Sequence, residues 1–262
     1  MKRVSTILVL PALALTLLGF SNTVLAQPPG GFGPPPEPTP DPVVAAIPAI
    51  TLISGAGEVY DSSAALWPDM GMDHFGYVAE EYQISGTADG EAYATRLVIR
   101  RPSDNSKYSG LVVAEPMHPA GAAHAFEYNS LYIMDEGHIA VEIDTQGVEQ
   151  IAAFNPERYG FINFSNNQTS EILAQAGALI KSEQSPLAEL GVRKMVLWGT
   201  SASSRILTNY LPSHQVFKLA DMRNIYDGFM PTMNGTTITP TDVPIIQVPT
   251  QHEFQSVATA IQ

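Results

Sequence analysis

The pattern of apolar and polar residues predicts a sheet whose strands alternate with helices. Tyr77–Thr87 and Tyr93–Arg100 alternate and end at turn residues, which predicts an antiparallel hairpin. From residue 110 onward, short buried runs alternate with helical periodicity, which predicts a mostly parallel α/β sheet with helices on both faces. The predicted strands are Ile50–Ser54, Gly110–Glu115, His138–Asp144, Met195–Trp198, Tyr226–Met230 and Pro244–Pro249, and the predicted helices are Ala125–Glu136, Thr169–Ser182 and one after Ser201.

The stretch 194–210 places a serine at a sharp turn between a buried strand and a helix. Gly199 ends the apolar run, and the residues after Ser201 regain helical spacing. Such a turn strains the serine backbone, so the residues two positions away must be small, and here they are Gly199 and Ser203. This arrangement is typical of a nucleophile elbow. The same serine could instead cap the helix, and the stretch alone does not decide between the two.

Length, charge and residue usage narrow the function classes. The chain has 262 residues and is 45% hydrophobic, which is enough for one sizeable domain. Its net charge of −13, with only 13 Lys and Arg, argues against nucleic acid or an anionic membrane as a partner. Since there is no cysteine, disulfides and cysteine nucleophiles are excluded.

The first 48 residues are expected to lie outside the folded domain. Lys2 and Arg3, the apolar run Ile7–Phe20 and the small residues 24–26 predict a signal peptide over residues 1–26, and the run is short for a membrane span. Without a lipoprotein cysteine, no stable anchor is expected, and the protein should reach the periplasm or the medium. Residues 27–48 are rich in proline and glycine and predict an unpacked linker, so the domain is expected over 49–262.

Residues that directly follow parallel strands carry the candidate chemistry, because active sites form at the carboxyl ends of such strands. The backbone of Met117 or His118 follows one strand, and together with the Ala202 N–H it is expected to hold an oxyanion. Glu253 follows the last predicted strand and is the candidate acid. Asp227 is a rival acid, but it begins its strand and is interpreted as structural.

The chain resembles a bacterial family of exported alpha/beta hydrolase domain proteins. The matching segments lie in order over about residues 75–255 and include EEYQISGTA, RLVIRRPSD, NPERYG, WGTSASSRILTNY and VPIIQVPTQHEF. The resemblance implies an α/β-hydrolase fold and ester hydrolysis, with Ser201 as nucleophile and Glu253 at the acid position, where aspartate is more usual.

The C-terminal end departs from that pattern. Relatives continue past the acid through a last strand and a loop with the catalytic histidine, whereas here no histidine follows His252. The domain is therefore expected to be C-terminally truncated, to use His252 or His118 as a substitute base, or to be inactive as written. The other histidines (His74, His124, His138 and His214) are interpreted as ordinary surface or loop residues.

Two functions remain after the sequence is read. The first is a secreted serine esterase acting on small-molecule esters through an acyl-enzyme on Ser201. The second is a truncated or degenerate hydrolase fold without catalysis, acting as a binding or remnant protein. No HExxH motif or acidic calcium loop is present, so we expect neither a metal nor a cofactor. The sequence does not give the acyl or alcohol group of the substrate or the oligomeric state.

Overall fold

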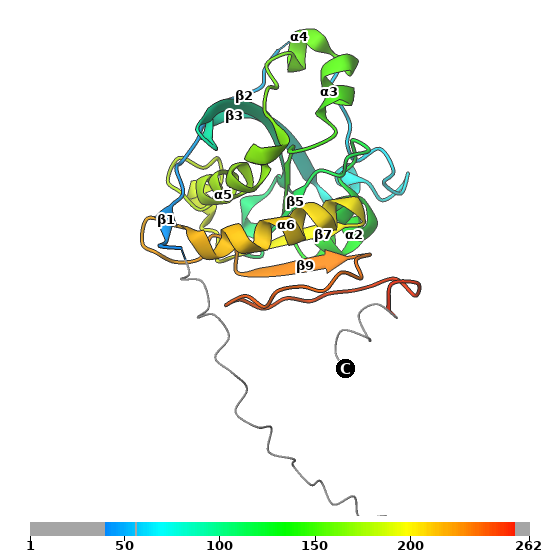
Figure 1. Cartoon of the computed structure of the whole chain (residues 1–262). Helices are drawn as coiled ribbons and strands as arrows, with labels where there is room; N and C mark the ends of the chain where they lie inside the picture. Colours follow the sequence, from blue (N-terminus) through cyan, green and yellow to red (C-terminus); the bar gives the residue numbers. More distant parts are fainter. Residues whose placement is uncertain (1–39, 56, 255–262) are drawn as a thin grey trace, which may run out of the picture. The chain divides into compact units, whose positions relative to one another are not determined.

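The computed structural model describes residues 40–55 and 57–254, which form a seven-stranded mixed sheet with helices on both faces (Figure 1). The expected signal peptide and the linker up to residue 39 lie outside the described residues. The sheet strands are β2 Ala49–Leu52, β3 Tyr77–Ala88, β4 Glu91–Pro102, β5 Leu111–Pro116, β6 Ile139–Ile143, β7 Lys194–Thr200 and β9 Gly228–Thr232. The helices are α1 Met72–Phe75, α2 His124–Asp135, α3 Val148–Phe154, α4 Pro156–Tyr159, α5 Thr169–Ile180 and α6 Ala202–Val216, with 3-10 turns at Asn105–Lys107, Asn166–Gln168 and Ala188–Leu190.

The strand order is β2-β3-β4-β6-β5-β7-β9, and its two halves run differently. Strands β2, β3, β4 and β6 pair antiparallel, and β3 and β4 form the predicted hairpin. Strands β6, β5, β7 and β9 pair parallel. The predicted strand at 244–249 runs parallel beside β9 through bridges at Ile245 and Val248. The predicted fold class is thereby confirmed, and the parallel half carries Ser201.

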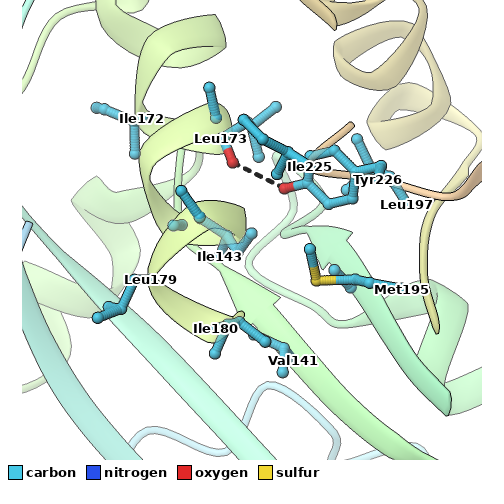
Figure 2. Close-up of a cluster of buried hydrophobic side chains, with 14 of the residues drawn as sticks. Val141, Ile143, Ile172, Leu173, Leu179, Ile180, Met195, Leu197, Ile225 and Tyr226 are labelled. Carbon is cyan, nitrogen blue, oxygen red and sulfur yellow. Dashed lines mark hydrogen bonds between the residues drawn. The ribbon is translucent and has the colours of Figure 1, made fainter. Parts of the chain in front are cut away.

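Successive side chains of the central strands point alternately into two hydrophobic cores, one on each face of the sheet. Leu197 and Val141 face a large core covered by α5 and α6, whereas Val113 and Ala140 face a second core covered by α2. Figure 2 shows part of the first core, in which the Tyr226 hydroxyl donates to the Leu173 carbonyl at 2.7 Å. Continuous apolar runs are what a sheet covered on both faces requires.

Close contact between α5 and the segment before β9 depends on a glycine in the helix. A Cβ added at Gly177 would lie 2.5 Å from the Ile225 Cγ2 atom and 2.9 Å from the Tyr226 ring. Both of these residues are fully buried and lie beside α5 in Figure 2. Glycine is unfavourable inside a helix, so its place here reflects packing rather than helix propensity.

The packed domain begins earlier than the expected boundary at residue 49. β1, Val43–Val44, pairs parallel with β8, Phe217–Lys218. Ala45 is buried, and its N–H donates to the Lys218 carbonyl at 2.8 Å. Residues 43–45 therefore pack on the domain. The predicted linker over residues 27–48 is wrong for its last residues, which belong to the folded part.

A buried network of charged residues lies on the sheet face that α2 covers. Arg96 is 1% exposed and binds Glu81 at 2.6 Å, Glu142 at 3.0 Å and Asp144 at 3.2 Å. Arg100 binds Glu142 from the other side at 2.8 Å. Burial raises the pKa of Asp144 well above its ordinary value. The charge of Arg96 acts to lower this pKa, and the charge of Glu142 raises it further.

The carboxyl of Glu115, on the same face, also has a raised pKa. Glu115 accepts the N–H groups of Ala125 and Phe126 at the start of α2. Burial and the charge of Glu142, its neighbour across the parallel ladder, raise the pKa of Glu115 to about 8 despite those bonds and Arg100.

Within the described part of the chain, no helix combines the length and apolarity that a membrane crossing needs.

Candidate active site

Ser201 occupies the turn between β7 and α6 in a conformation that few non-glycine residues adopt. Its backbone angles are φ 58° and ψ −120°, and its side chain is exposed. A positive φ in a non-glycine residue costs about 1–3 kcal/mol and persists only where the surroundings enforce it. Its hydroxyl makes no capping bond to α6, so the helix-cap interpretation is wrong for the described structure.

The small residue before the serine is required by close backbone packing. A Cβ added at Gly199 would lie 2.6 Å from the Ser203 carbonyl oxygen and 2.7 Å from the Ser204 Cα. Any larger residue at position 199 would push the first turn of α6 away from the strand. The predicted reason for a small residue there thus agrees with the geometry.

Ser203 stands where a second glycine is usual, and its hydroxyl is used within the turn. The side chain is fully buried, its Oγ accepts the Thr200 N–H at 2.8 Å and donates to the Thr200 carbonyl at 2.9 Å. A buried hydroxyl satisfied in both roles costs little. The serine is therefore compatible with the sharp turn and closes it.

The segment that leaves β9 holds the backbone of Ser201 on both sides. The Ser201 N–H donates to the Thr232 carbonyl at 3.0 Å, and the Ser204 hydroxyl donates to the Ser201 carbonyl at 2.6 Å. The buried Asn234 amide in turn donates to the Ser204 hydroxyl at 2.9 Å. Sequence reasoning missed Thr232 and Asn234, since only the pairing of β7 with β9 brings them to the turn.

One of the three expected oxyanion donors is available. The Ala202 N–H, at the first position of α6, has no acceptor within residues 40–55 and 57–254. The Met117 N–H donates to the Ile143 carbonyl and the His118 N–H to the Ala122 carbonyl, each at 3.0 Å. Those two amides already extend the sheet and close a loop, so in this arrangement neither is a free donor, which corrects the expectation for them.

The strand register nevertheless brings the predicted rim residues to one edge of the sheet. β5 and β7 pair with Ala114 opposite Leu197, so His118 and Ser201 both follow the carboxyl ends of neighbouring parallel strands. Neighbouring strands lie roughly 4.8 Å apart. The Glu253 segment reaches the same edge through the bridge between Thr232 and Val248.

Glu253 packs against the loop that follows β9. A Cβ added at Gly235 would lie 2.4 Å from the Glu253 Cβ. One oxygen of the half-buried carboxylate accepts both the N–H and the hydroxyl of Thr250, at 2.8 and 2.7 Å. Gly235 follows Asn234 directly, so the acid and the nucleophile turn contact the same short loop, although no hydrogen bond joins them among the described residues.

The two candidate bases differ in how their rings are engaged. The His118 Nδ1 atom accepts the Ala120 N–H at 3.0 Å, which places the proton of the neutral ring on Nε2. Burial and the neighbouring His124 lower the pKa of His118, so the ring is neutral at pH 7. Nε2 is then a donor and does not take a proton from a hydroxyl. His252 is exposed and makes no hydrogen bond within the described residues.

Asp227 lies at the other end of the strands. It precedes β9, and its two oxygens bind Lys181 at 2.7 Å and Lys194 at 2.9 Å. Burial raises its pKa, but the bonds from these lysines outweigh that effect and leave the pKa below its ordinary value. These contacts agree with the structural interpretation of Asp227.

Within residues 40–55 and 57–254, no three histidine or acidic side chains gather in a way that could hold a metal ion.

The chain matches a family of known proteins over most of its length. A family model described as "Alpha/beta hydrolase domain" matches residues 47–262. A search of curated proteins found no match.

Solved structures with a similar chain trace include three esterases. One is a brefeldin A esterase, described as a bacterial homologue of human hormone-sensitive lipase, with 13% identity over 66% of this chain and a TM-score of 0.43. A cold-adapted esterase from an Arctic intertidal metagenomic library has 18% identity over 60% of this chain and a TM-score of 0.35. Esterase Est22 has 13% identity over 72% of this chain and a TM-score of 0.42. The matches span 44%, 60% and 60% of those proteins, respectively.

Proposed function

Because the chain belongs to the alpha/beta hydrolase domain family, we propose that it hydrolyses carboxylic esters of small molecules through an acyl-enzyme on Ser201. The observation that carries this proposal is the strained, exposed and uncapped serine at the turn between β7 and α6. A strained backbone conformation at an exposed nucleophilic side chain is a feature of functional sites rather than of helix caps.

The proposed reaction begins when the Ser201 Oγ attacks the acyl carbonyl carbon. The carbonyl oxygen gains negative charge, and the free Ala202 N–H at the start of α6 donates a hydrogen bond to it. The alcohol leaves with a proton, the acyl group stays on Oγ, and water then releases the acid. The helix dipole adds to the stabilisation of the oxyanion.

The base that takes the Ser201 proton is proposed to be His252. It neighbours Glu253 at the same sheet edge, and both of its ring nitrogens are free of hydrogen bonds within the described residues. His118 is less suited, because its Nδ1 atom is already an acceptor for Ala120. A positioned base contributes about 10²–10⁴-fold to such a reaction.

Labelling by a fluorophosphonate probe tests the nucleophile, because the probe reacts only with an activated serine. We expect labelling of the wild-type protein and of Ser106→Ala, in which an exposed serine far from the turn is removed. Ser201→Ala should not be labelled. If the wild-type protein is not labelled either, the non-catalytic alternative, a binding or remnant protein, holds instead.

The base is tested by two single variants under the same conditions. His252→Ala should lower the labelling rate at least about 100-fold, whereas His118→Ala should change it less than about threefold. The opposite order would make His118 the base. Equal rates in both variants and the wild type would show that neither ring accepts the proton.

We also propose that the protein is exported to the periplasm or the medium. The support is sequence alone: two basic residues, an apolar run at Ile7–Phe20 and small residues before Gln27. Expression in a Gram-negative host, fractionation and N-terminal sequencing test this. An exported protein that begins near Gln27 is expected, and a cytoplasmic protein that retains Met1 would contradict it.

A further inference from the structure

Five of the 13 basic residues of this acidic chain line a single cavity of about 640 Å³. The cavity lies at the amino ends of the parallel strands, since Lys194 begins β7 and Asp227 precedes β9. Ser201 follows the opposite end of β7, so the cavity is separate from the candidate active site. The five basic residues are Lys181, Arg193, Lys194, Lys218 and Arg223.

Positive charge exceeds negative charge on the walls of this cavity. Two acids also line it, Asp227 and Asp242. Asp227 binds one lysine with each oxygen, and Asp242 lies 3.8 Å from the Lys218 Nζ atom. Arg223 is paired with Asp221, an exposed acid that is not part of the wall. Five cations against two wall acids form an excess that contrasts with the net charge of −13.

The cations repel each other and keep unused hydrogen-bond donors. Burial lowers the pKa of Lys181, and the nearby Arg223 and Lys194 lower it further, against the effect of Asp227. Each ammonium group carries three N–H donors, and Lys181 and Lys194 each give one to Asp227. Arg193 gives one Nη2 donor to the Ser109 carbonyl and has four more. A bound anion would satisfy these donors and reduce the repulsion.

We propose that this cavity binds a small oxyanion with two negative charges, a phosphate or phosphomonoester group. Guanidinium and ammonium groups that line one hollow suit phosphate oxygens, and arginine binds them with two parallel bonds. A long polyanion is disfavoured, because beyond the cavity it would meet a strongly acidic chain. The occupant is therefore a molecule small enough to lie within the cavity.

Calorimetric titration with inorganic phosphate tests the proposal at an ionic strength held constant with sodium chloride. Lys194 and Arg223 are the suitable pair to remove, since their side chains are 68% and 77% exposed and their loss should not disturb folding. Lys107→Ala with Arg205→Ala is the matched control, because it removes the same charge from two exposed residues outside the cavity.

Saturable phosphate binding is expected for the wild-type protein and the control, with a Kd at least tenfold higher in Lys194→Ala/Arg223→Ala. Methyl phosphate in place of phosphate then distinguishes a free anion from a phosphomonoester as the preferred form. Absence of saturable binding to the wild-type protein would overturn the proposal, as would equal Kd values in the two double variants. The thermal unfolding midpoint of each variant without phosphate shows that both are folded.

Discussion

The buried network around Arg96 and the turn at Ser201 are two polar regions on the sheet, and they are built in opposite ways. The network consists of two arginines and the carboxyl groups that contact them at 2.6–3.2 Å, all shielded from solvent. The turn consists of neutral groups, namely hydroxyls, amides and carbonyls, around one exposed oxygen.

The difference shows that strong electrostatic perturbation does not by itself mark the reactive site. The most perturbed carboxyls, Asp144 and Glu115, are buried and bonded to groups that hold them in place. Ser201 has the opposite character, because its backbone is strained and its hydroxyl is left without a partner among the described residues. In this protein the charged network joins strands β3, β4 and β6, and backbone geometry presents the nucleophile.

The largest effect is expected on removing the central cation of the network. Arg96→Met leaves Glu81, Glu142 and Asp144 buried without their shared partner. Loss of one member of a buried ion pair costs about 3–5 kcal/mol of unfolding free energy. Chemical denaturation of the purified variant measures this change.

Arg101→Met is the matched control for that measurement. Arg101 lies next in sequence to the network on β4 but pairs with Glu80 where both side chains are partly exposed. We expect a change below about 1 kcal/mol for this pair. If the two substitutions cost the same, the network does not contribute as a buried ion cluster.

The second effect is a pH dependence of stability that comes from Glu115. Its folded pKa of about 8 lies above the ordinary value of 4.5, so between these values the folded protein keeps a proton that the unfolded chain has lost. Unfolding then releases a proton, and this contribution lowers the unfolding free energy as pH rises from 5 to 8. The loss is on the order of 3–5 kcal/mol.

Urea denaturation of the wild-type protein and Glu115→Gln between pH 5 and pH 8 isolates that contribution. The stability of the wild type relative to the variant should fall as pH rises, because glutamine does not ionise. The exposed Glu189→Gln serves as the comparison and should track the wild type at every pH. Parallel profiles for wild type and Glu115→Gln would contradict a raised pKa.

Of the three predicted effects, the one at the turn is expected to be the smallest. Asn234→Ala removes the donor to Ser204 and the acceptor for the Thr236 N–H, which costs about 1–2 kcal/mol. Because Ser204 holds the Ser201 carbonyl, the rate of fluorophosphonate labelling should fall by more than the loss of folded protein explains. This rate is measured from labelling reactions quenched at set times, at a temperature where the variant is fully folded.

Asn163→Ala, which removes an exposed amide, should change neither stability nor labelling. A normal labelling rate in folded Asn234→Ala would show that the turn keeps its geometry without the β9 loop. That result would remove the positioning role of Asn234 and leave the assignment of Ser201 intact.

The sequence by itself determined the fold class, the alternation of strands and helices along the chain, and the place of the turn. These features depend on residues close together in the chain: a buried run before Gly199, small residues around Ser201 and helical spacing after it. The short helices α3 and α4 were not predicted, since each spans at most two turns and shows too little periodicity.

Only the tertiary structure decided which groups around the serine are free and which are engaged. The amides of Met117 and His118 directly follow a strand and look available in the sequence, but Ile143 and Ala122, on neighbouring parts of the fold, accept them. Likewise, Thr232 and Asn234 hold the turn because β9 pairs with β7. Hydrogen bonds between segments depend on strand pairing and register, which local patterns of hydrophobicity do not specify.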